Sequence, residues 1–417
     1  MNENICGEAH IVAKMIYFHY NLRHMLETPT VYITRDIERA TASLHQKNYY
    51  IITNSTPFAK SLSNLTPNIV LVSKSRPLDT HELLEQTKVK KIINSLSNPS
   101  LVVFKNTTLI EKICKDNKWR LLNPAACLAA IVEEKISQLE WLGDLQKYLP
   151  PHQVMLGKNL EWKNENFIAQ FNRAHTGSGT MLIKLKSEVE EIRNKFPERP
   201  IRVTKFIEGP AFTSNNIVWG GKILPGPIMY QITGLSPFTR NQFATIGNDW
   251  ELPNILLNNS QKESYQKTVE EVGIKLAKDG WKGLFGIDAM LDSKAGAIHL
   301  IEINARQPAS TTYESQLQKV NTTFEAHLSA LLDLPNTNFT LSPVTKGAQI
   351  IQRVPAGGAL SDVKKKIKQL EKLGLNVILY TNKKPETDLL RIQSKKGIML
   401  AHNQFNELGK KISEILK

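Results

Sequence analysis

Short apolar runs alternate with amphipathic stretches over residues 30–122. The runs are rich in β-branched and aromatic residues, which predicts strands. These runs occupy residues 31–34, 49–53, 68–72, 90–96 and 101–104. Between them, segments such as 35–47 and 81–87 mix apolar and polar residues in the manner of helices. This alternation predicts an α/β unit, in which helices cover both faces of a parallel sheet.

The pattern changes at a proline-rich break, residues 148–153. One helix is predicted before this break, from Pro124 to about Asp144. Beyond it, the order of the elements predicts an α+β unit with mainly antiparallel strands. Strands are predicted at 154–157, 166–172, 201–207, 211–219 and 222–233, a hairpin at 282–304, and helices at 186–196, 264–278 and 313–332.

These changes of pattern divide the chain into three parts. We expect an N-terminal α/β domain over residues 1–125, followed by a central domain over residues 126–340. Within the central domain, a smaller lobe is expected at about 150–207. Residues 341–417 predict a small α/β subdomain at the C-terminus, whose role the sequence leaves open.

Composition and charge narrow the class of protein. The 417 residues are 41% hydrophobic and 22% charged, which excludes collagen-like and wholly disordered chains. Lysine and arginine total 53 against 39 aspartate and glutamate residues, a formal charge of +14. Such an excess attracts nucleic acid, an anionic membrane surface or nucleotide phosphates, and charge alone does not choose among them. The basic run 364–374 carries no interleaved aromatic residues, which argues against nucleic acid.

Cysteine content and hydropathy indicate the compartment. The three cysteines, Cys6, Cys114 and Cys127, form no C-x-x-C pair, and this argues against a disulfide framework or a structural zinc site. No apolar run approaches the ~18–20 residues that span a bilayer. The N-terminal segment lacks the features of a signal peptide. We therefore expect a cytoplasmic protein with no membrane partner.

The hairpin segment 283–310 carries the strongest chemical signal. Centring its turn on Ala295 places Asp288 opposite Glu302, and Asn304 projects from the same face as Glu302. Two carboxylates across a ladder repel each other unless a cation lies between them. Carboxylate and amide oxygens suit Mg²⁺, and the guanidinium of Arg306, next in the alternation, suits a phosphate oxygen. The alternative is a solvated hairpin face with Arg306 as a surface counter-ion.

A small-residue loop lies upstream, between two predicted strands in segment 167–185. Its residues are Thr176, Gly177, Ser178, Gly179 and Thr180. Such a loop is able to present successive backbone N–H groups to phosphate oxygens. It is not a P-loop, since the GK[ST] ending is absent and a strand follows. By itself it also fits an ordinary hairpin loop.

Together these segments resemble the ATP-grasp superfamily. The matching pieces are the lysine in IVEEKISQLEWL, the loop HTGSGT, the hinge strand VTKFIEGPAF, and the hairpin GIDAM…LIEINARQPAS, which is similar to the family's metal signature. QITGLSPFT and GNDW resemble the carbamoyl-phosphate-synthase-like and biotin-carboxylase-like branch. The resemblance covers about 125–335 and extends to 30–122 as a pre-ATP-grasp domain, followed by the two-lobed ATP-grasp fold and the C-terminal appendage.

The resemblance implies an ATP site between the two lobes. Lys135 would contact the α/β phosphates from a helix, and residues 176–180 would close over the β/γ phosphates. The hinge would read the adenine edge with the backbone of Thr204, Lys205, Phe206 and Ile207. One position departs from the family pattern, because Gln170 stands where a second phosphate lysine is usual. An uncharged glutamine there predicts weaker phosphate binding from this position, and Lys184 or Lys205 are the candidates to compensate.

The hairpin would complete the site. By the same resemblance, Asp288, Glu302 and Asn304 would hold Mg²⁺, and Arg306 would stabilise the transferring phosphoryl group. The implied activity is a ligase that activates a carboxylate as an acyl phosphate, joins it to an amine, and releases ADP and phosphate. Its partners would be small-molecule substrates, and a homodimer is compatible with the family.

Two alternatives to that activity stay open at this point. One is a carboxylase or carbamoyl-phosphate-type enzyme that activates bicarbonate. The other is a non-catalytic protein that binds nucleotides or nucleic acid. The sequence names neither the carboxylate nor the acceptor, because specificity would come from loops, here about 225–262 and 306–318.

Overall fold

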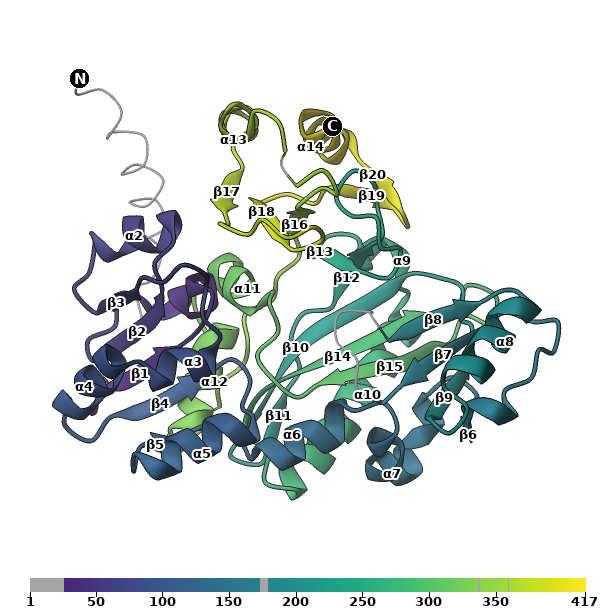
Figure 1. Cartoon of the computed structure of the whole chain (residues 1–417), viewed down its shortest axis with the longest axis horizontal. Helices are drawn as coiled ribbons and strands as arrows, with labels where there is room; N and C mark the ends of the chain where they lie inside the picture. Colours follow the sequence, from purple (N-terminus) through teal and green to yellow (C-terminus); the bar gives the residue numbers. More distant parts are fainter. Residues whose placement is uncertain (1–25, 173–178, 337, 359) are drawn as a thin grey trace.

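The computed structural model describes residues 26–172, 179–336, 338–358 and 360–417 (Figure 1). The N-terminal part is a parallel sheet in the order β3-β2-β1-β4-β5. Its strands are β1 (Thr30–Ile33), β2 (Tyr49–Asn54), β3 (Ile69–Val72), β4 (Ser100–Val103) and β5 (Arg120–Leu121). Its helical segments are η1 (Ile37–Ser43), α2 (Pro57–Ser63), α3 (Thr80–Glu85), α4 (Thr87–Ser95) and α5 (Thr108–Asp116). The predicted α/β unit is confirmed.

Both faces of this sheet are buried because successive side chains point to opposite sides. Val31 and Ile33 join the core under α3, α4 and α5, whereas Tyr32 belongs to the core that includes Phe324 of α12 (Thr323–Leu331). The N-terminal domain therefore packs directly on a helix from the second half of the chain.

One predicted strand of this domain is wrong. Residues 90–96 lie in and just after helix α4, where Val89 and Ile93 are buried and Lys91 and Asn94 are exposed. Apolar residues four positions apart form a single stripe on a helix. The adjacent Ile92 and Ile93 gave the segment the appearance of a strand, but only Ile93 reaches the core.

The smaller lobe is an antiparallel sheet in the order β6-β9-β7-β8. Its strands are β6 (His152–Leu156), β7 (Phe167–Phe171), β8 (Thr180–Ile183) and β9 (Pro200–Lys205). Helix α8 (Lys186–Lys195) covers one face, where its Val189 and Ile192 pack with Ala169, Ile201 and Val203. The other face carries the intervening residues of β7 and β9.

The larger sheet runs β15-β14-β10-β12-β13-β16-β18-β17, with β11 paired to β10, and its pairings are antiparallel. Its strands are β10 (Ala211–Trp219), β11 (Lys222–Leu224), β12 (Met229–Thr233), β13 (Thr245–Asp249), β14 (Gly283–Leu291), β15 (Ile298–Asn304), β16 (Ala348–Arg353), β17 (Asn376–Leu379) and β18 (Asp388–Ser394). The α+β part with antiparallel strands is thereby confirmed, and strands of the C-terminal segment extend the same sheet.

Helices pack around the larger sheet (Figure 1). The long helix α10 (Asn259–Lys278) buries Tyr265, Val269 and Leu276 in the main core, and α11 (Thr311–Gln318) and α12 lie near the N-terminal domain. Shorter or terminal elements complete the chain: η3 (Gly157–Asn159), α9 (Pro253–Leu256), α13 (Val363–Lys372), β19 (Met399–Ala401), β20 (Gln404–Phe405) and α14 (Glu407–Leu416). Within the described residues, no helix is both long and apolar enough to cross a bilayer.

Two predicted helices are each divided in the structure. The segment from Pro124 onward forms α6 (Ala126–Glu133), α7 (Ser137–Leu142) and η2 (Gly143–Tyr148). The break falls where Asn172 accepts hydrogen bonds from the backbone N–H groups of Lys135, at 3.2 Å, and Ile136, at 2.8 Å. The segment 313–332 divides into α11 and α12, where Lys319 and Asn321 adopt positive φ. Tertiary hydrogen bonds end the first helix, and local backbone conformation ends the second. The sequence pattern alone predicts that both helices continue.

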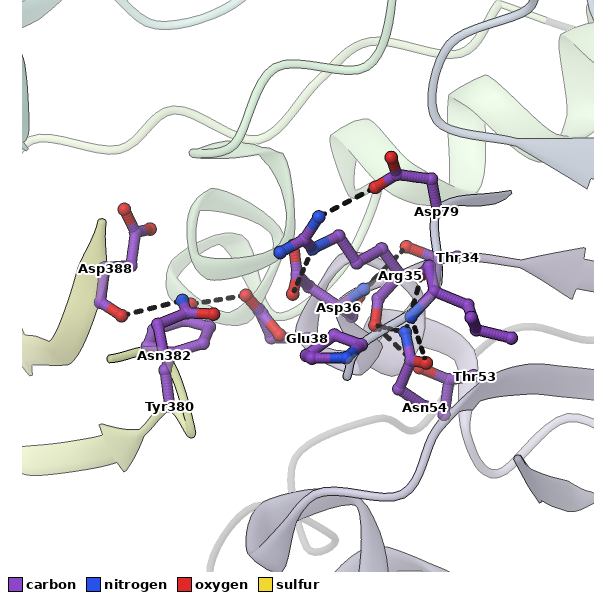
Figure 2. Close-up of polar contacts among 12 residues, drawn as sticks. Thr34, Arg35, Asp36, Glu38, Thr53, Asn54, Asp79, Tyr380, Asn382 and Asp388 are labelled. Atoms are coloured by element: carbon purple, nitrogen blue, oxygen red, sulfur yellow. Dashed lines mark hydrogen bonds and ion pairs between the residues drawn. The ribbon is translucent and has the colours of Figure 1, made fainter. Parts of the chain in front are cut away.

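The N-terminal and C-terminal parts also meet through polar side chains (Figure 2). The hydroxyl of Tyr380, just after β17, donates to Glu38 in η1. The guanidinium of Arg391 on β18 donates in turn to the Tyr380 hydroxyl at 2.9 Å. These contacts hold the carboxyl end of β1 against the extended edge of the larger sheet.

His327 provides a test of the packing between α12 and the larger sheet. It is buried, and its Nδ1 accepts the backbone N–H of Leu284 at 3.1 Å. Burial lowers the pKa of His327 to about 3. Below about pH 6.5 the unfolded chain binds a proton on His327, whereas the folded chain binds it only near pH 3. The free energy of unfolding therefore falls as the pH drops from about 6.5 towards 3. At ~1.4 kcal/mol per pH unit, the cost near pH 5 is about 2 kcal/mol.

His327→Gln should therefore flatten the loss of stability between pH 7 and about 5 in urea unfolding. His81→Gln, on α3, is the control for the replacement of a histidine outside this contact. An unaltered profile in His327→Gln would contradict the assignment of this proton to His327.

Candidate active site

The β14–β15 hairpin has the predicted register. Asp288 pairs with Glu302, Gly286 pairs with Asn304, and a bulge follows Asp288. The turn is closed by Asp292, whose Oδ1 accepts the backbone N–H groups of Lys294 and Ala295. The two carboxylates and the amide therefore come together on one face of the larger sheet.

Asp288 accepts hydrogen bonds from the side chains of Thr213, Gln231 and Asn304. Its Oδ1 accepts from the Thr213 hydroxyl at 2.6 Å, and its Oδ2 accepts from the Asn304 amide at 3.1 Å. Burial raises the pKa of Asp288, and the negative charge of Glu302 raises it further. A cation would relieve both effects, because it stabilises the ionised form of each carboxylate.

The donor set of this hairpin fits Mg²⁺. Asp288 and Glu302 supply carboxylate oxygens and Asn304 an amide oxygen, the hard ligands that Mg²⁺ takes together with water and substrate phosphates. In the part of the chain that the structure describes, no group of three or more His, Cys, Asp or Glu side chains is arranged to hold a metal. A metal here would accordingly depend on the amide and on ligands from outside the protein, which is the usual mode for Mg²⁺ and not for zinc.

Lys135 also approaches the hairpin, from the segment between α6 and α7. Its Nζ lies 3.0 Å from Oε2 of Glu302, and the lysine is 6% exposed. The residue lies in the turn between α6 and α7, so its predicted position on a helix is wrong. Asn172 fixes this turn, because it accepts hydrogen bonds from the backbone N–H groups of Lys135 and Ile136. The fixed turn directs the Lys135 side chain towards the hairpin.

Arg306 is held by a carboxylate that sequence reasoning missed. Glu133, at the end of α6, binds the Arg306 guanidinium with one oxygen and the Lys105 ammonium with the other. Burial acts to lower the pKa of Arg306, but the charges of Glu133 and Glu302 outweigh it and the pKa is raised. The only sequence signal was an acidic residue two positions before Lys135, in a segment read as a continuous helix.

The smaller lobe, called the lid lobe from here on, approaches this hairpin through β7 and β9. Gln170 on β7 is buried, and its amide lies 3.3 Å from the Thr180 hydroxyl on β8. The carbonyl of Gly179 accepts the backbone N–H of Phe171 at 3.1 Å. The predicted phosphate-loop residues Thr176, Gly177 and Ser178 lie outside the described residues.

The predicted hinge links β9 of the lid to β10 of the larger sheet. Thr204 and Ile207 are buried, Phe206 is half-buried and Lys205 is exposed. The backbone N–H of Lys205 donates to the carbonyl of Pro151 at 2.9 Å, within the lid lobe. An adenine-reading role for these four residues stays a prediction.

Comparison with solved structures identifies the fold. A carboxyaminoimidazole ribonucleotide synthase from Aspergillus clavatus, solved with ATP, matches with a TM-score of 0.65 and 14% identity over 93% of this chain and 97% of its own. A Staphylococcus aureus N5-carboxyaminoimidazole synthetase, solved with ADP, gives 0.64 and 12% over 96% and 100%. The chain has the ATP-grasp fold. An L-amino acid ligase from Bacillus licheniformis shares this fold with a TM-score of 0.62 and 16% identity over 93% and 96%.

Comparison of sequences alone assigns this chain to no family. No family model matches the chain, and no curated protein does. At these identities the likeness is one of fold, and the site rests on the geometry around Asp288, Glu302, Lys135 and Arg306.

Proposed function

We propose that this protein is an ATP-dependent ligase that activates a carboxylate as an acyl phosphate and joins it to an amine. The observation that carries the proposal is the arrangement of charge on the hairpin. Asp288 and Glu302 face each other across the ladder, and Lys135 and Arg306 lie beside them. A divalent cation between carboxylates, flanked by fixed cations, is the arrangement that phosphoryl transfer requires.

The proposed reaction has two steps. A carboxylate oxygen of the substrate attacks the γ-phosphorus of ATP, the bond to the β-phosphate oxygen breaks, and ADP leaves. The amine then attacks the acyl carbon, phosphate leaves, and the amine loses a proton. Asp288, Glu302 and Asn304 would hold Mg²⁺, which would supply charge neutralisation at the phosphate oxygens. Arg306, fixed by Glu133, would stabilise the charge on the transferring phosphoryl group.

A second candidate is activation of bicarbonate in place of an organic carboxylate. The comparison with the carboxyaminoimidazole ribonucleotide synthases favours it, because their named product is a carboxylated amine. The likeness to an L-amino acid ligase favours the organic carboxylate. Both candidates need the same phosphoryl-transfer machinery and differ in the acid that occupies it.

Release of ADP tests both candidates. The purified protein with ATP and Mg²⁺ should release ADP when supplied with a productive pair from a panel of amino acids, at a rate on the order of 1–10 per second. The same assay in bicarbonate-free buffer, and then with bicarbonate and an amine, separates the two acids. Dependence on bicarbonate alone would select the second candidate. Nucleotide binding with no ADP release under any of these conditions would indicate a binding protein.

A further inference from the structure

Arg202 on β9 is a buried guanidinium with few partners. It is 1% exposed, and its Nη1 lies 3.5 Å from the carbonyl oxygen of Lys135 and from Oε1 of Gln138. Its Nε has no hydrogen-bond partner, and the carboxylate that acts on its charge is that of Glu302. Burial lowers the pKa of Arg202 to about 10, and the charge of Glu302 opposes this. Burying a guanidinium with so few acceptors is costly unless an anion lies near it.

The position of Arg202 in the ladder shows which way it faces. Arg202 pairs with Gln170 on β7, and paired residues of a ladder share one face of the sheet. Its neighbours Ile201 and Val203 pack under α8 on the opposite face. Arg202 and Gln170 therefore lie on the face turned away from α8, and the contact with Lys135 shows that this face looks onto the candidate active site.

Two buried cations share one carboxylate in this part of the site. Lys135 and Arg202 are both buried, and both interact with one carboxylate, Glu302: Lys135 through a 3.0 Å ion pair and Arg202 through longer-range attraction. Gln170, directly across from Arg202, adds no charge. A phosphate chain that enters beside Lys135 and Arg202 would be attracted by both of these cations.

We propose that Arg202 supplies the second positive charge of a triphosphate subsite, beside Lys135, with the charge carried on β9 and not on β7. This inference rests on the proposed function, since the anion it names is the phosphate chain of ATP. Arg202 is a positioning residue that acts in two ways. Its charge reaches the phosphates through a poorly screened interior, and its guanidinium holds the turn from which Lys135 projects.

Affinity for ligands with increasing numbers of phosphates tests the assignment. Arg202→Met keeps the length and burial of the side chain and removes its charge. Measured by calorimetry, its affinity for adenosine should stay unchanged, and its affinities for ADP and ATP should fall progressively, by about tenfold or more for ATP. Arg199→Met is the matched control. Arg199 is an exposed arginine of the same lobe, stacked 4.4 Å from the Phe171 ring centroid, and its replacement should alter none of the three affinities.

Moving the charge to the neighbouring strand distinguishes charge from structural support. In Arg202→Met, the further change Gln170→Lys should restore ATP affinity to within about threefold of the original value. Equal losses for adenosine and ATP in Arg202→Met would overturn the proposal, because purely structural support does not depend on phosphate number. Unchanged ATP affinity would overturn it as well.

A separate variant covers the case in which Arg202→Met does not fold. Gln170→Glu leaves Arg202 in place and sets a carboxylate directly across the ladder from it, so ATP affinity should fall while adenosine affinity is retained. Full ATP affinity in Gln170→Glu would overturn the proposal. Failure of the unmodified protein to bind ATP or ADP would overturn the proposed function together with this inference, whereas normal binding by the arginine variant would overturn this inference alone.

Discussion

Glu302→Gln should lower ATP-dependent ADP release by about 100- to 1000-fold. Glu302 lies across the ladder from Asp288, and its carboxylate lies 3.0 Å from the Lys135 ammonium. The same negative charge would therefore help to hold both the Mg²⁺ ion and the lysine proposed to contact the phosphates. Glutamine keeps the shape of the side chain and removes its charge. Mg²⁺ would then be held by Asp288 and the Asn304 amide alone, and the apparent Mg²⁺ requirement should rise.

The measurement is ADP release across a Mg²⁺ titration, with nucleotide binding followed separately by calorimetry. Glu198→Gln is the control, because Glu198 forms an exposed ion pair with Lys158 in the lid lobe. It should behave as the original protein does. If Glu302→Gln shows the original Mg²⁺ dependence and the original rate, the hairpin is not the metal site.

Arg306→Ala should lower the maximal rate by about 1000-fold and leave ATP affinity nearly unchanged. The physical reason is that a guanidinium directed at a transferring phosphoryl group stabilises charge that develops only in the transition state. The negative charges of Glu133 and Glu302 keep Arg306 protonated. Arg76→Ala, at an exposed ion pair with Glu82, serves as the control and should retain the full rate.

Glu133→Gln extends this test to the carboxylate that holds Arg306. Because Glu133 binds both Arg306 and Lys105, the neutral side chain should free the guanidinium and lower the rate by roughly tenfold, less than the loss of Arg306 itself. A combined Arg306→Ala and Glu133→Gln variant should be no slower than Arg306→Ala alone, since the two act as one unit. If the rate losses of the two single variants multiply in the combined variant, Glu133 acts independently of Arg306.

The hairpin was accessible to sequence reasoning because its constraints are local. Side chains alternate along a strand, and a short turn sets the register, so the pairing of Asp288 with Glu302 follows once the turn is placed. The parallel sheet of the N-terminal domain was similarly predictable from strand–helix alternation. The misassigned segment 90–96 failed for a local reason too, since short apolar runs fit either a strand or the buried stripe of a helix.

The surroundings of the hairpin were not accessible in the same way. Glu133 is one acidic residue in a run of two, and nothing nearby in the sequence marks it as the partner of Arg306, which lies 173 positions away. The burial of Arg202 was equally unpredictable, because a polar residue within an apolar strand is usually exposed to solvent. Each residue acquires its proposed role from a contact with a distant segment of the chain, and only tertiary packing creates such contacts.

By itself the sequence determined the class of fold, the hairpin register and which oxygen-bearing side chains the hairpin brings together, because these depend on periodicity and on chemistry carried by neighbouring residues. The tertiary structure alone decided where the cations lie. It broke the helix at Lys135 through Asn172, tied Arg306 to Glu133, and buried Arg202 opposite an uncharged Gln170. Electrostatic interactions depend on separation in space and on exclusion of water, and both are set by how distant segments pack.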